Sequence, residues 1–353
     1  LRMQNPYWIA HRNLRNTDKK RYMLSFSASY DILPWLNVAG RVRIDNANSL
    51  YTQKLYASSN TTITDGGKNG HYTEQREYDT QTYADIMVNI NKTFGDDWSL
   101  QANVGASINN VKIDQLSYRG PIQENGLPNV FNVFDLDDSK KRAEKYGWQE
   151  QTQSIFASVE VGWKQMLYLT LTGRNDWASQ LANSPQSSFF YPSVGLSAVI
   201  SSMADLSKAG ISFLKVRGSY AEVGNAPQRF ITGVNTPLLT GGIVSSDSYA
   251  PAVNLTPERT KSFEAGLNAK FLGNRIWMDF TYYNTNTYNQ LFSYDAPPST
   301  GYKRAYVNAG KVNNWGIEAV VGYKNKWRDF SWSTNVNFSM NRNKIKELVP
   351  EGT

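Results

Sequence analysis

KSFEAGLNAKFLGNRIWMDFTYYN, residues 261–284, contains two runs of alternating side chains separated by a short turn signal at 272–275. In the first run, apolar residues occupy every second position over 263–271, and mostly polar residues lie between them. The same alternation continues over 276–282. Because successive side chains of a β-strand point to opposite faces, this period of two predicts an antiparallel hairpin with one apolar and one polar face.

The same alternation recurs along the chain, from residues 22–30 to residues 330–340. Runs that fit this pattern predict about twelve strands, and helical periodicity is nearly absent. The mean hydropathy is −0.52, and no apolar run approaches the roughly 18 residues that a spanning helix needs. These observations exclude a helical membrane protein, but a membrane β-barrel is compatible with them because its strands alternate in the same way.

The lengths of the connections alternate as well. Short links are expected at 31–35, 95–98, 164–166, 201–212, 272–275 and 325–329, and long links at about 46–79, 114–151, 176–189, 225–261 and 289–311. Short turns on one side and long loops on the other are typical of outer-membrane barrels. Soluble sandwiches and propellers also alternate apolar with polar residues, but they have no reason to place a long loop at every second connection.

Aromatic residues recur near the ends of the short links: Trp35, Phe94, Trp98, Trp163, Tyr168, Phe271, Trp327 and Phe330. Their recurrence on one side favours an interfacial girdle, in which the rings lie at the depth of the lipid headgroups. The alternative is that each ring simply packs at a hairpin end of a β core. The fold class predicted from these patterns is therefore all-β, an antiparallel transmembrane β-barrel in contact with a lipid bilayer.

Charge and motifs exclude several other classes. The net charge is +7 and the chain has no cysteine, so disulfide scaffolds and thiol nucleophiles are excluded. The basic residues are dispersed, which argues against nucleic acid as a partner. The sequence has no Gly-x-Ser-x-Gly elbow, no metal-spaced histidine pair and no glycine-rich phosphate loop, so we expect no enzyme.

Few residues suggest a cofactor. Asp135, Asp137 and Asp138 could together bind calcium in a loop, although an ordinary acidic loop is the expected state and no other cofactor is predicted. The histidines, His11 and His71, are expected to be exposed loop residues without a role as ligands.

Several short motifs carry a family resemblance. They are Asn-Pro-Tyr-Trp at 5–8, Val-Gly-Asn-Ala at 223–226, Leu-Thr-Pro-Glu-Arg-Thr at 255–260, Phe-Glu-Ala-Gly at 263–266, Asp-Phe-Thr-Tyr-Tyr at 279–283, Asn-Ala-Gly at 308–310 and Asn-Trp-Gly-Ile-Glu at 314–318. In this order and spacing the chain resembles SusC/RagA-type TonB-dependent outer-membrane transporters over nearly its whole length.

This resemblance implies a large barrel of about 22 strands that is plugged by an N-terminal domain. Residues 1–353 are then expected to be the middle portion of one transmembrane barrel domain, with the plug, the TonB-contacting segment and the C-terminal strands outside this chain. The implied function is TonB-dependent import of a bulky nutrient, an oligosaccharide or a peptide, across the outer membrane of a Gram-negative bacterium. The implied partners are a SusD-like surface lipoprotein and the TonB energy-transducing complex.

Two other functions remain open from the sequence: a passive porin or adhesin-like barrel, and a soluble β-rich binding protein. For an importer, aromatic residues in the long loops are candidates for substrate contact. Each either packs the loops together or offers its face to a ligand. These residues are Tyr72, Tyr146, Trp148, Phe189, Phe190, Tyr249, Phe292 and Tyr294.

Overall fold

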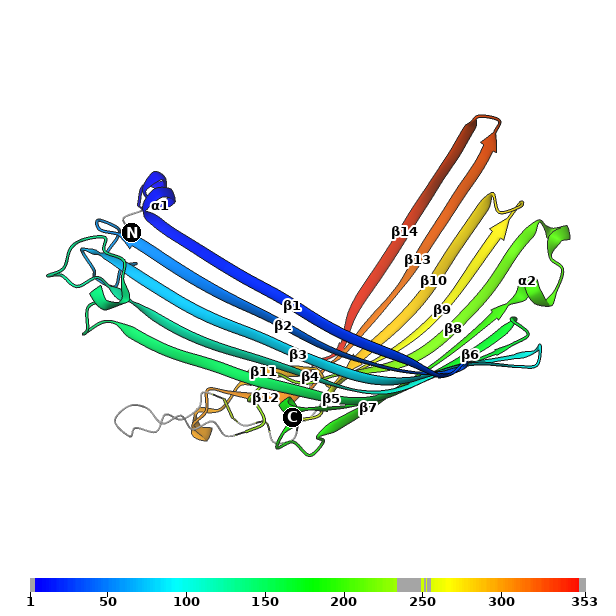
Figure 1. The fold of residues 1–353 in the computed structure, drawn as a ribbon, viewed down its shortest axis with the longest axis horizontal. Helices are drawn as coiled ribbons and strands as arrows, with labels where there is room; N and C mark the ends of the chain where they lie inside the picture. Colours follow the sequence, from blue (N-terminus) through cyan, green and yellow to red (C-terminus); the bar gives the residue numbers. More distant parts are fainter. Residues whose placement is uncertain (1–3, 234–248, 251, 253–254, 349–353) are drawn as a thin grey trace. The chain divides into compact units, whose positions relative to one another are not determined.

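The computed structural model describes residues 4–233, 249, 250, 252 and 255–348, and its main element is one large sheet (Figure 1). The sheet has 12 strands in the order β1-β2-β3-β4-β5-β6-β7-β8-β9-β10-β13-β14. Their bounds are β1 (Asn13–Leu33), β2 (Leu36–Tyr56), β3 (Gly70–Phe94), β4 (Trp98–Pro121), β5 (Arg142–Trp163), β6 (Leu167–Ala178), β7 (Ser188–Val199), β8 (Ile211–Asn225), β9 (Glu258–Phe271), β10 (Ile276–Tyr288), β13 (Lys311–Trp327) and β14 (Phe330–Glu347). The expected number of strands is confirmed.

The remaining elements are small. A second sheet pairs β11 (Leu291–Asp295) with β12 (Arg304–Asn308), and the helices are α1 (Pro6–Arg12), α2 (Ile200–Met203) and the 3-10 turns η1 (Val133–Asp135), η2 (Ser179–Leu181), η3 (Ser207–Ala209) and η4 (Pro298–Thr300). Asn5 caps α1 by accepting a hydrogen bond from the Tyr7 amide at 2.9 Å. None of the helices in the described part of the chain is both long and apolar enough to cross a membrane.

The hairpin over 261–284 forms as its alternation predicts. Phe271 pairs with Ile276 and Leu267 pairs with Phe280, so the apolar residues of β9 and β10 lie on one face. Leu272, Gly273 and Asn274 turn the chain with φ of 53°, 65° and 65°, the left-handed region that glycine and asparagine tolerate best. The register continues through β13 and β14, where Phe280 pairs with Ala319 and Ala319 pairs with Phe338.

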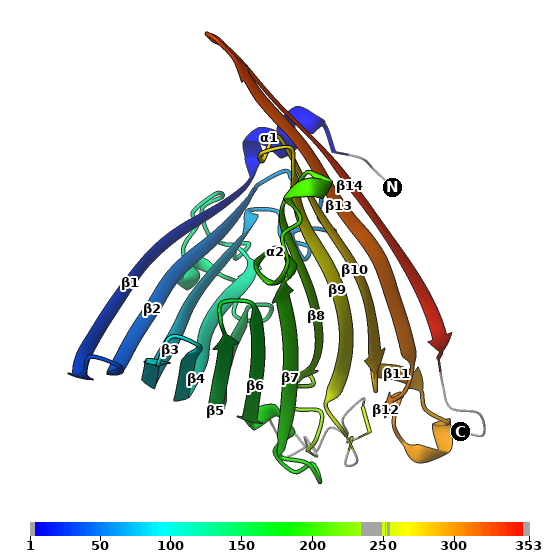
Figure 2. The ribbon, with the colours of Figure 1, turned by 90° about the vertical axis from the view of Figure 1, so that its right-hand side faces the viewer.

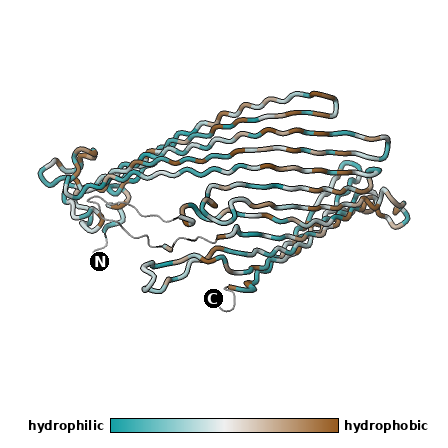
Figure 3. The backbone as a smooth tube through the Cα atoms, turned by 90° about the horizontal axis from the view of Figure 1, so that it is seen from below, coloured by the Kyte–Doolittle hydropathy of each residue, from teal (hydrophilic) through white to brown (hydrophobic). Residues whose placement is uncertain are grey.

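The sheet therefore has two unlike sides, which we call the apolar face and the polar face, and Figure 3 shows the alternation along the strands. Large side chains of the apolar face are exposed: Val104 by 51%, Val336 by 68% and Phe26 by 73%. A soluble monomer rarely exposes so many neighbouring apolar residues. The polar face carries Ser, Thr, Asn and charged side chains, together with some aromatic rings such as Trp277 and Phe156.

Two of the expected long loops are shorter than their predicted bounds. The link expected at 46–79 narrows to 57–69 because β2 continues to Tyr56 and β3 begins at Gly70. The link expected at 114–151 likewise narrows to 122–141. The prediction was wrong there because these strand extensions mix polar and apolar residues on both faces, so the backbone ladder continues where the regular alternation has ended. The link at 225–261 falls partly outside the described residues.

The chain divides into two compact units. Unit 1 comprises residues 1–27, 41–84 and 109–151, and unit 2 comprises residues 28–40, 85–108 and 152–353. All of the short turns belong to unit 2. Figure 2 shows the β11–β12 hairpin at the end of β10 and β13 that lies away from the β13–β14 turn.

Glycines on the polar face lie beneath long side chains of neighbouring strands. An added Cβ at Gly322 would lie 2.1, 2.2 and 2.4 Å from three ring atoms of Trp277. Tyr283 covers Gly316 and Phe156 covers Gly105 in the same way. The absence of a side chain at these positions allows a large ring to lie flat against the sheet.

Replacing Gly322 with valine should destabilise the fold by about 1–3 kcal/mol, because the Trp277 ring must move to admit the new side chain. The folded fraction of the full-length protein, read from its heat-modifiable mobility on an SDS gel, measures the effect. Gly195→Ala is the matched control, since its Cβ would lie 3.8 Å from the nearest atom of Thr170. Equal folding of Gly322→Val and the wild type would contradict this packing.

Candidate functional site

The polar face of unit 2 holds an arginine cluster centred on Arg174 of β6. Its Nε donates to Asp176 Oδ1 at 2.7 Å and to the Tyr191 hydroxyl at 3.1 Å, and its Nη2 donates to Ser154 Oγ at 2.7 Å. The Tyr191 hydroxyl also donates to Asp176. The guanidinium carbon lies 5.6 Å from the centroid of the Phe156 ring. Strands β5, β6 and β7 thus fix a planar guanidinium beside an aromatic face.

A cavity of about 370 Å³ adjoins this cluster. It is lined by Asn103, Phe156, Ala157, Ser158, Thr172, Gly173, Arg174, Tyr191, Pro192, Ser193, Ala221, Glu222 and Val223. The β7–β8 ladder ends at the pair Ser193–Ala221, and Pro192, the next residue outward, has no N–H to continue it. The cavity therefore forms where β7 and β8 part, and it offers hydroxyl, guanidinium and aromatic groups in one place.

A second cluster surrounds Arg217 of β8. Its Nη2 donates to Asp279 Oδ1 at 3.2 Å and to Thr281 Oγ1 at 2.6 Å, and Nη1 donates to Asn268. Gly266 makes room for this side chain, because an added Cβ would lie 2.6 Å from Arg217 Nε. A cavity of about 160 Å³ lies beside it, lined by Thr170, Gly195, Leu196, Ser197, Arg217, Gly218, Ser219, Glu264 and Gly266. These groups can bind polar ligands by hydrogen bonds but do not form a nucleophile with its base.

Replacing Arg174 with methionine should destabilise unit 2 by about 1–2 kcal/mol, because it leaves the Asp176 carboxylate, whose side chain is 11% exposed, without its cation. Thermal unfolding of the full-length protein measures the loss. Arg304→Met is the control, since its partner Asp295 is 91% exposed and exposed ion pairs contribute little. Equal losses in the two variants would contradict the structural role of the Arg174 cluster.

Two of the candidate aromatic residues are buried in loop packing. Tyr72 is 6% exposed, its ring centroid lies 6.1 Å from that of Phe131, and its hydroxyl donates to Glu74 Oε2 at 3.0 Å. Burial and the Glu74 carboxylate raise the pKa of Tyr72 to about 12. Phe189 is 4% exposed and packs against Ala178 and Leu181. Neither ring offers a free face to a ligand.

The other candidates are more accessible and lie in different elements. Tyr249 stacks on Tyr306 at 5.2 Å, and Phe292 and Tyr294 belong to the neighbouring strand β11. Tyr146 is exposed and Trp148 is half-buried, both in β5. Phe190 is exposed but pairs with Asn175, which places its ring on the apolar face.

The sequence did not single out Arg174, Tyr191, Arg217 or Asp279 as site residues. A usable signal existed, because each is a charged or hydroxyl-bearing residue at a polar-face position inside a strand. What could not be deduced was which strands bring them together, since this depends on the register of pairs such as Arg174–Tyr191 and Arg217–Gly266.

The histidines differ in their environment. His11 is exposed, as expected, but it lies in the helix α1 and not in a loop. The expectation for His71 was wrong: it is 5% exposed, with Nε2 at 3.4 Å from Asp65 Oδ2. Asp65 belongs to the segment 57–69, and the burial of the imidazole lowers the pKa of His71.

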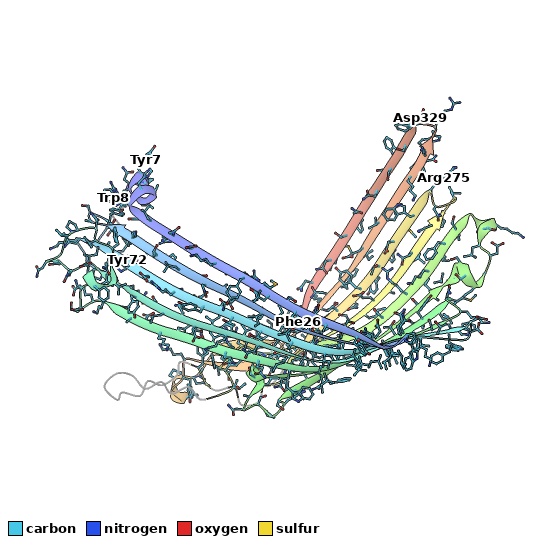
Figure 4. All side chains as sticks on the ribbon, viewed as in Figure 1. Tyr7, Trp8, Phe26, Tyr72, Arg275 and Asp329 are labelled. Carbon is cyan, nitrogen blue, oxygen red and sulfur yellow. The ribbon has the colours of Figure 1, made fainter. Side chains whose placement is uncertain are left out.

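Figure 4 shows Trp8 and Tyr72 at the loop end of the strands of unit 1, and Arg275 and Asp329 at neighbouring turns of unit 2.

The acidic loop has its carboxylates engaged within the protein. Asp137 accepts hydrogen bonds from the Ser139 amide at 2.9 Å and from Ser139 Oγ at 2.6 Å, which lower the pKa of Asp137. Asp138 pairs with Lys141. Across the described ranges, no three His, Asp or Glu side chains gather to form a metal site. An ordinary acidic loop stays the expectation for Asp135, Asp137 and Asp138, with a loop calcium as the less favoured alternative.

Comparison with known proteins identifies the family. The family model described as TonB dependent receptor-like, beta-barrel, matches residues 2–351. TonB-dependent receptor P3 of Formosa agariphila is 25% identical over 99% of this chain and 35% of its own length. TonB-dependent receptor SusC of Bacteroides thetaiotaomicron is 32% identical over 27% of this chain and 10% of its own.

Solved structures show the same fold. The RagAB peptide transporter matches with a TM-score of 0.85 at 19% identity, over 98% of this chain and 38% of that one. The siderophore receptor PiuA of Acinetobacter baumannii matches with a TM-score of 0.56 at 13% identity, over 92% of this chain and 47% of that one. The chain spans about a third of the length of the curated relatives that match it throughout. Since the family model covers nearly every residue, the chain belongs to the TonB-dependent receptor-like β-barrel family.

Proposed function

We propose that this chain forms part of the wall of an outer-membrane transporter that imports a bulky nutrient by TonB-dependent active transport. The observation that carries the proposal is the two-sided sheet of a TonB-dependent receptor barrel, with an exposed apolar face and a polar face that bears the Arg174 and Arg217 clusters. The apolar face suits contact with lipid, and the polar face suits a wet lumen through which a hydrophilic solute passes.

The proposal includes an orientation. The long connections at 57–69, 122–141, 179–187 and 289–310, with the described part of the link at 225–261, face the outside of the cell, and the short turns of unit 2 face the periplasm. Long loops carry binding functions in barrels of this kind, whereas short turns only reverse the strand direction.

The proposed partners are a SusD-like surface lipoprotein, which would close over the loops, and the TonB complex, which would supply the energy. The support comes from relatives named TonB-dependent receptor SusC and RagAB peptide transporter. The proposed substrate is an oligosaccharide or a peptide. The cavity beside Arg174 suits both, because hydroxyls, an arginine and an aromatic ring can bind sugar hydroxyls or peptide amides.

Uptake by living cells tests this function. Cells expressing the full-length protein should accumulate a labelled oligosaccharide or peptide mixture, and deletion of TonB should reduce accumulation to the background of cells that lack the transporter. Deletion of the proposed SusD-like lipoprotein should reduce it strongly as well. Uptake that persists without TonB would identify a passive porin instead.

Trp148 provides a more local test of substrate contact. It lies in β5 an even number of residues from Ser154 and Phe156, so its side chain is on the polar face with theirs. Its ring is half-buried. Trp148→Ala should weaken substrate binding by about five- to tenfold if the ring stacks on the ligand. Phe190→Ala, on the apolar face, is the matched control. Unchanged binding by the Trp148 variant, measured by calorimetry, would remove this residue from the site.

A further inference from the structure

The apolar face changes its chemistry sharply toward the loop ends of β8, β9, β10, β13 and β14. The last row that carries large aromatic rings contains Tyr220, Phe263 and Trp315, and the register aligns them with Asn284 of β10 and Arg342 of β14. In the next two rows toward the loops, the same face carries Lys261 and then Arg259 on β9, with Lys311 on β13. Together with two residues of β14 they form what we call the basic rim: Arg259, Lys261, Lys311, Arg342 and Lys344.

Glu222 is an acidic residue at the centre of the basic rim, and it is paired with Lys261 and Arg259. The Glu222 carboxylate lies 3.3 Å from Lys261 Nζ and 3.7 Å from Arg259 Nη1, and it accepts a hydrogen bond from the Tyr220 hydroxyl at 2.8 Å. Its side chain is 15% exposed, against 44% for Lys261 and 38% for Arg259. The surface that faces outward is therefore cationic.

Two ammonium groups of the basic rim approach one aromatic ring. Lys311 Nζ lies 5.0 Å and Lys261 Nζ 6.0 Å from the centroid of Tyr288. Lys344 and Arg342 are exposed on β14, where Glu347, paired in register with Lys311, is the nearby acid. Like charges gathered on one surface repel each other, and an anion placed between them relieves this repulsion.

On β2, β3 and β4 the first positions of the apolar face beyond the apolar run are uncharged. Just beyond the apolar runs of β2, β3 and β4, Asn46 donates to Thr80 at 2.8 Å, and Asn110 accepts from Gln149 at 2.7 Å. The next cation there, Lys112, pairs with Asp114 at 2.9 Å. The excess positive charge therefore distinguishes the basic rim from the loop ends of β2, β3 and β4.

We propose that the basic rim binds the phosphate groups of anionic lipids in the outer leaflet of the membrane. Aromatic rings of a barrel mark the depth of the membrane interface, and each further row on one face lies about 7 Å higher along the strand. The basic rim therefore begins at the headgroup level, where lipid phosphates are found. The inference rests on the proposed function, because it requires that this face meets lipid.

Lipid A binding by the full-length transporter tests the basic rim. The test variant is Lys261→Gln/Lys311→Gln, and the matched control is Lys215→Gln/Lys270→Gln, which removes two lysines of β8 and β9 from the polar face. We expect the test variant to bind phosphorylated lipid A about thirtyfold more weakly than the wild type, since each lysine near an anionic membrane surface contributes about fivefold. The control should bind like the wild type.

Lipid A treated with phosphatase and inorganic phosphate serve as further probes. The treated lipid should bind the wild type and the test variant equally and weakly. Unchanged binding of phosphorylated lipid A by the test variant would overturn the inference. Complete displacement of lipid A by excess inorganic phosphate would also overturn it, because the site would then recognise a free anion.

The test also separates this inference from the proposed function. Both double variants must show the heat-modifiable mobility of the wild type, which establishes that they are folded. If lipid A binding is unaffected while an arginine on the apolar face still blocks membrane insertion, only the lipid site is refuted. If that arginine is harmless, the proposed function itself fails.

Discussion

Arginine in place of Val104 should destabilise the inserted protein by about 2–4 kcal/mol, the cost of placing this side chain on the lipid face of a barrel near the bilayer midplane. Val104 lies in β4 on the apolar face and is 51% exposed, so an arginine there would point away from the protein. Arginine at Asn103 should be tolerated, because this neighbour lies on the polar face and lines the cavity beside Arg174.

The two variants differ by one position in the same strand, so each controls for the other. The fraction of full-length protein that is folded in purified outer membranes measures the effect. We expect a large loss for Val104→Arg and near-normal amounts for Asn103→Arg. Equal sensitivity of the two positions would contradict the assignment of the faces and, with it, a lipid-facing wall.

Alanine in place of Phe189 should destabilise the packed connection between β6 and β7 by about 3 kcal/mol or more. This is the usual cost of removing a buried aromatic ring. The ring packs with Ala178 and with Leu181, which is fully buried. It also fills the space above Gly224, where an added Cβ would lie 2.6 Å from Phe189 Cδ2. Its loss would leave the connection at 179–187 without its core.

Protease treatment of intact cells reads out this effect. Phe189→Ala should accelerate cleavage within 179–187, whereas Phe190→Ala should leave the rate nearly unchanged because that ring is 53% exposed. If Phe189→Ala altered substrate binding without altering cleavage, the ring would be a ligand contact and not a packing residue.

The strands were predictable where one face is apolar and the other polar. The hairpin at 261–284 has its register set by this contrast, because a slip of one residue would bring every apolar side chain to the polar face. The extensions of β2 and β3 toward Tyr56 and Gly70 lack this contrast, so their backbone pairing left no pattern in the sequence. A β-ladder satisfies backbone hydrogen bonds whatever the side chains are.

The site was harder to predict than the fold. Phe189 and Phe190 are adjacent aromatic residues that look equivalent in the sequence, yet the period of two sends one into the loop core and the other to the apolar face. His71 is buried by a loop whose packing no local pattern reveals. The Arg174 and Arg217 clusters require the register of several strands at once, which local periodicity does not specify.

Under the proposed function, the glycines that lie beneath aromatic rings on the polar face limit how the bore of the transporter can change. The ring of Trp277 lies over Gly322, and the ring of Tyr283 lies over Gly316, so each pair adds only one side chain to the thickness of the sheet. Enlarging Gly322 alone would push the Trp277 ring toward the proposed solute path, and replacing Trp277 alone by a small residue would leave a hollow over the backbone of Gly322. The width of the path is therefore set by matched pairs, so it can be retuned smoothly only when both members of a pair are exchanged together.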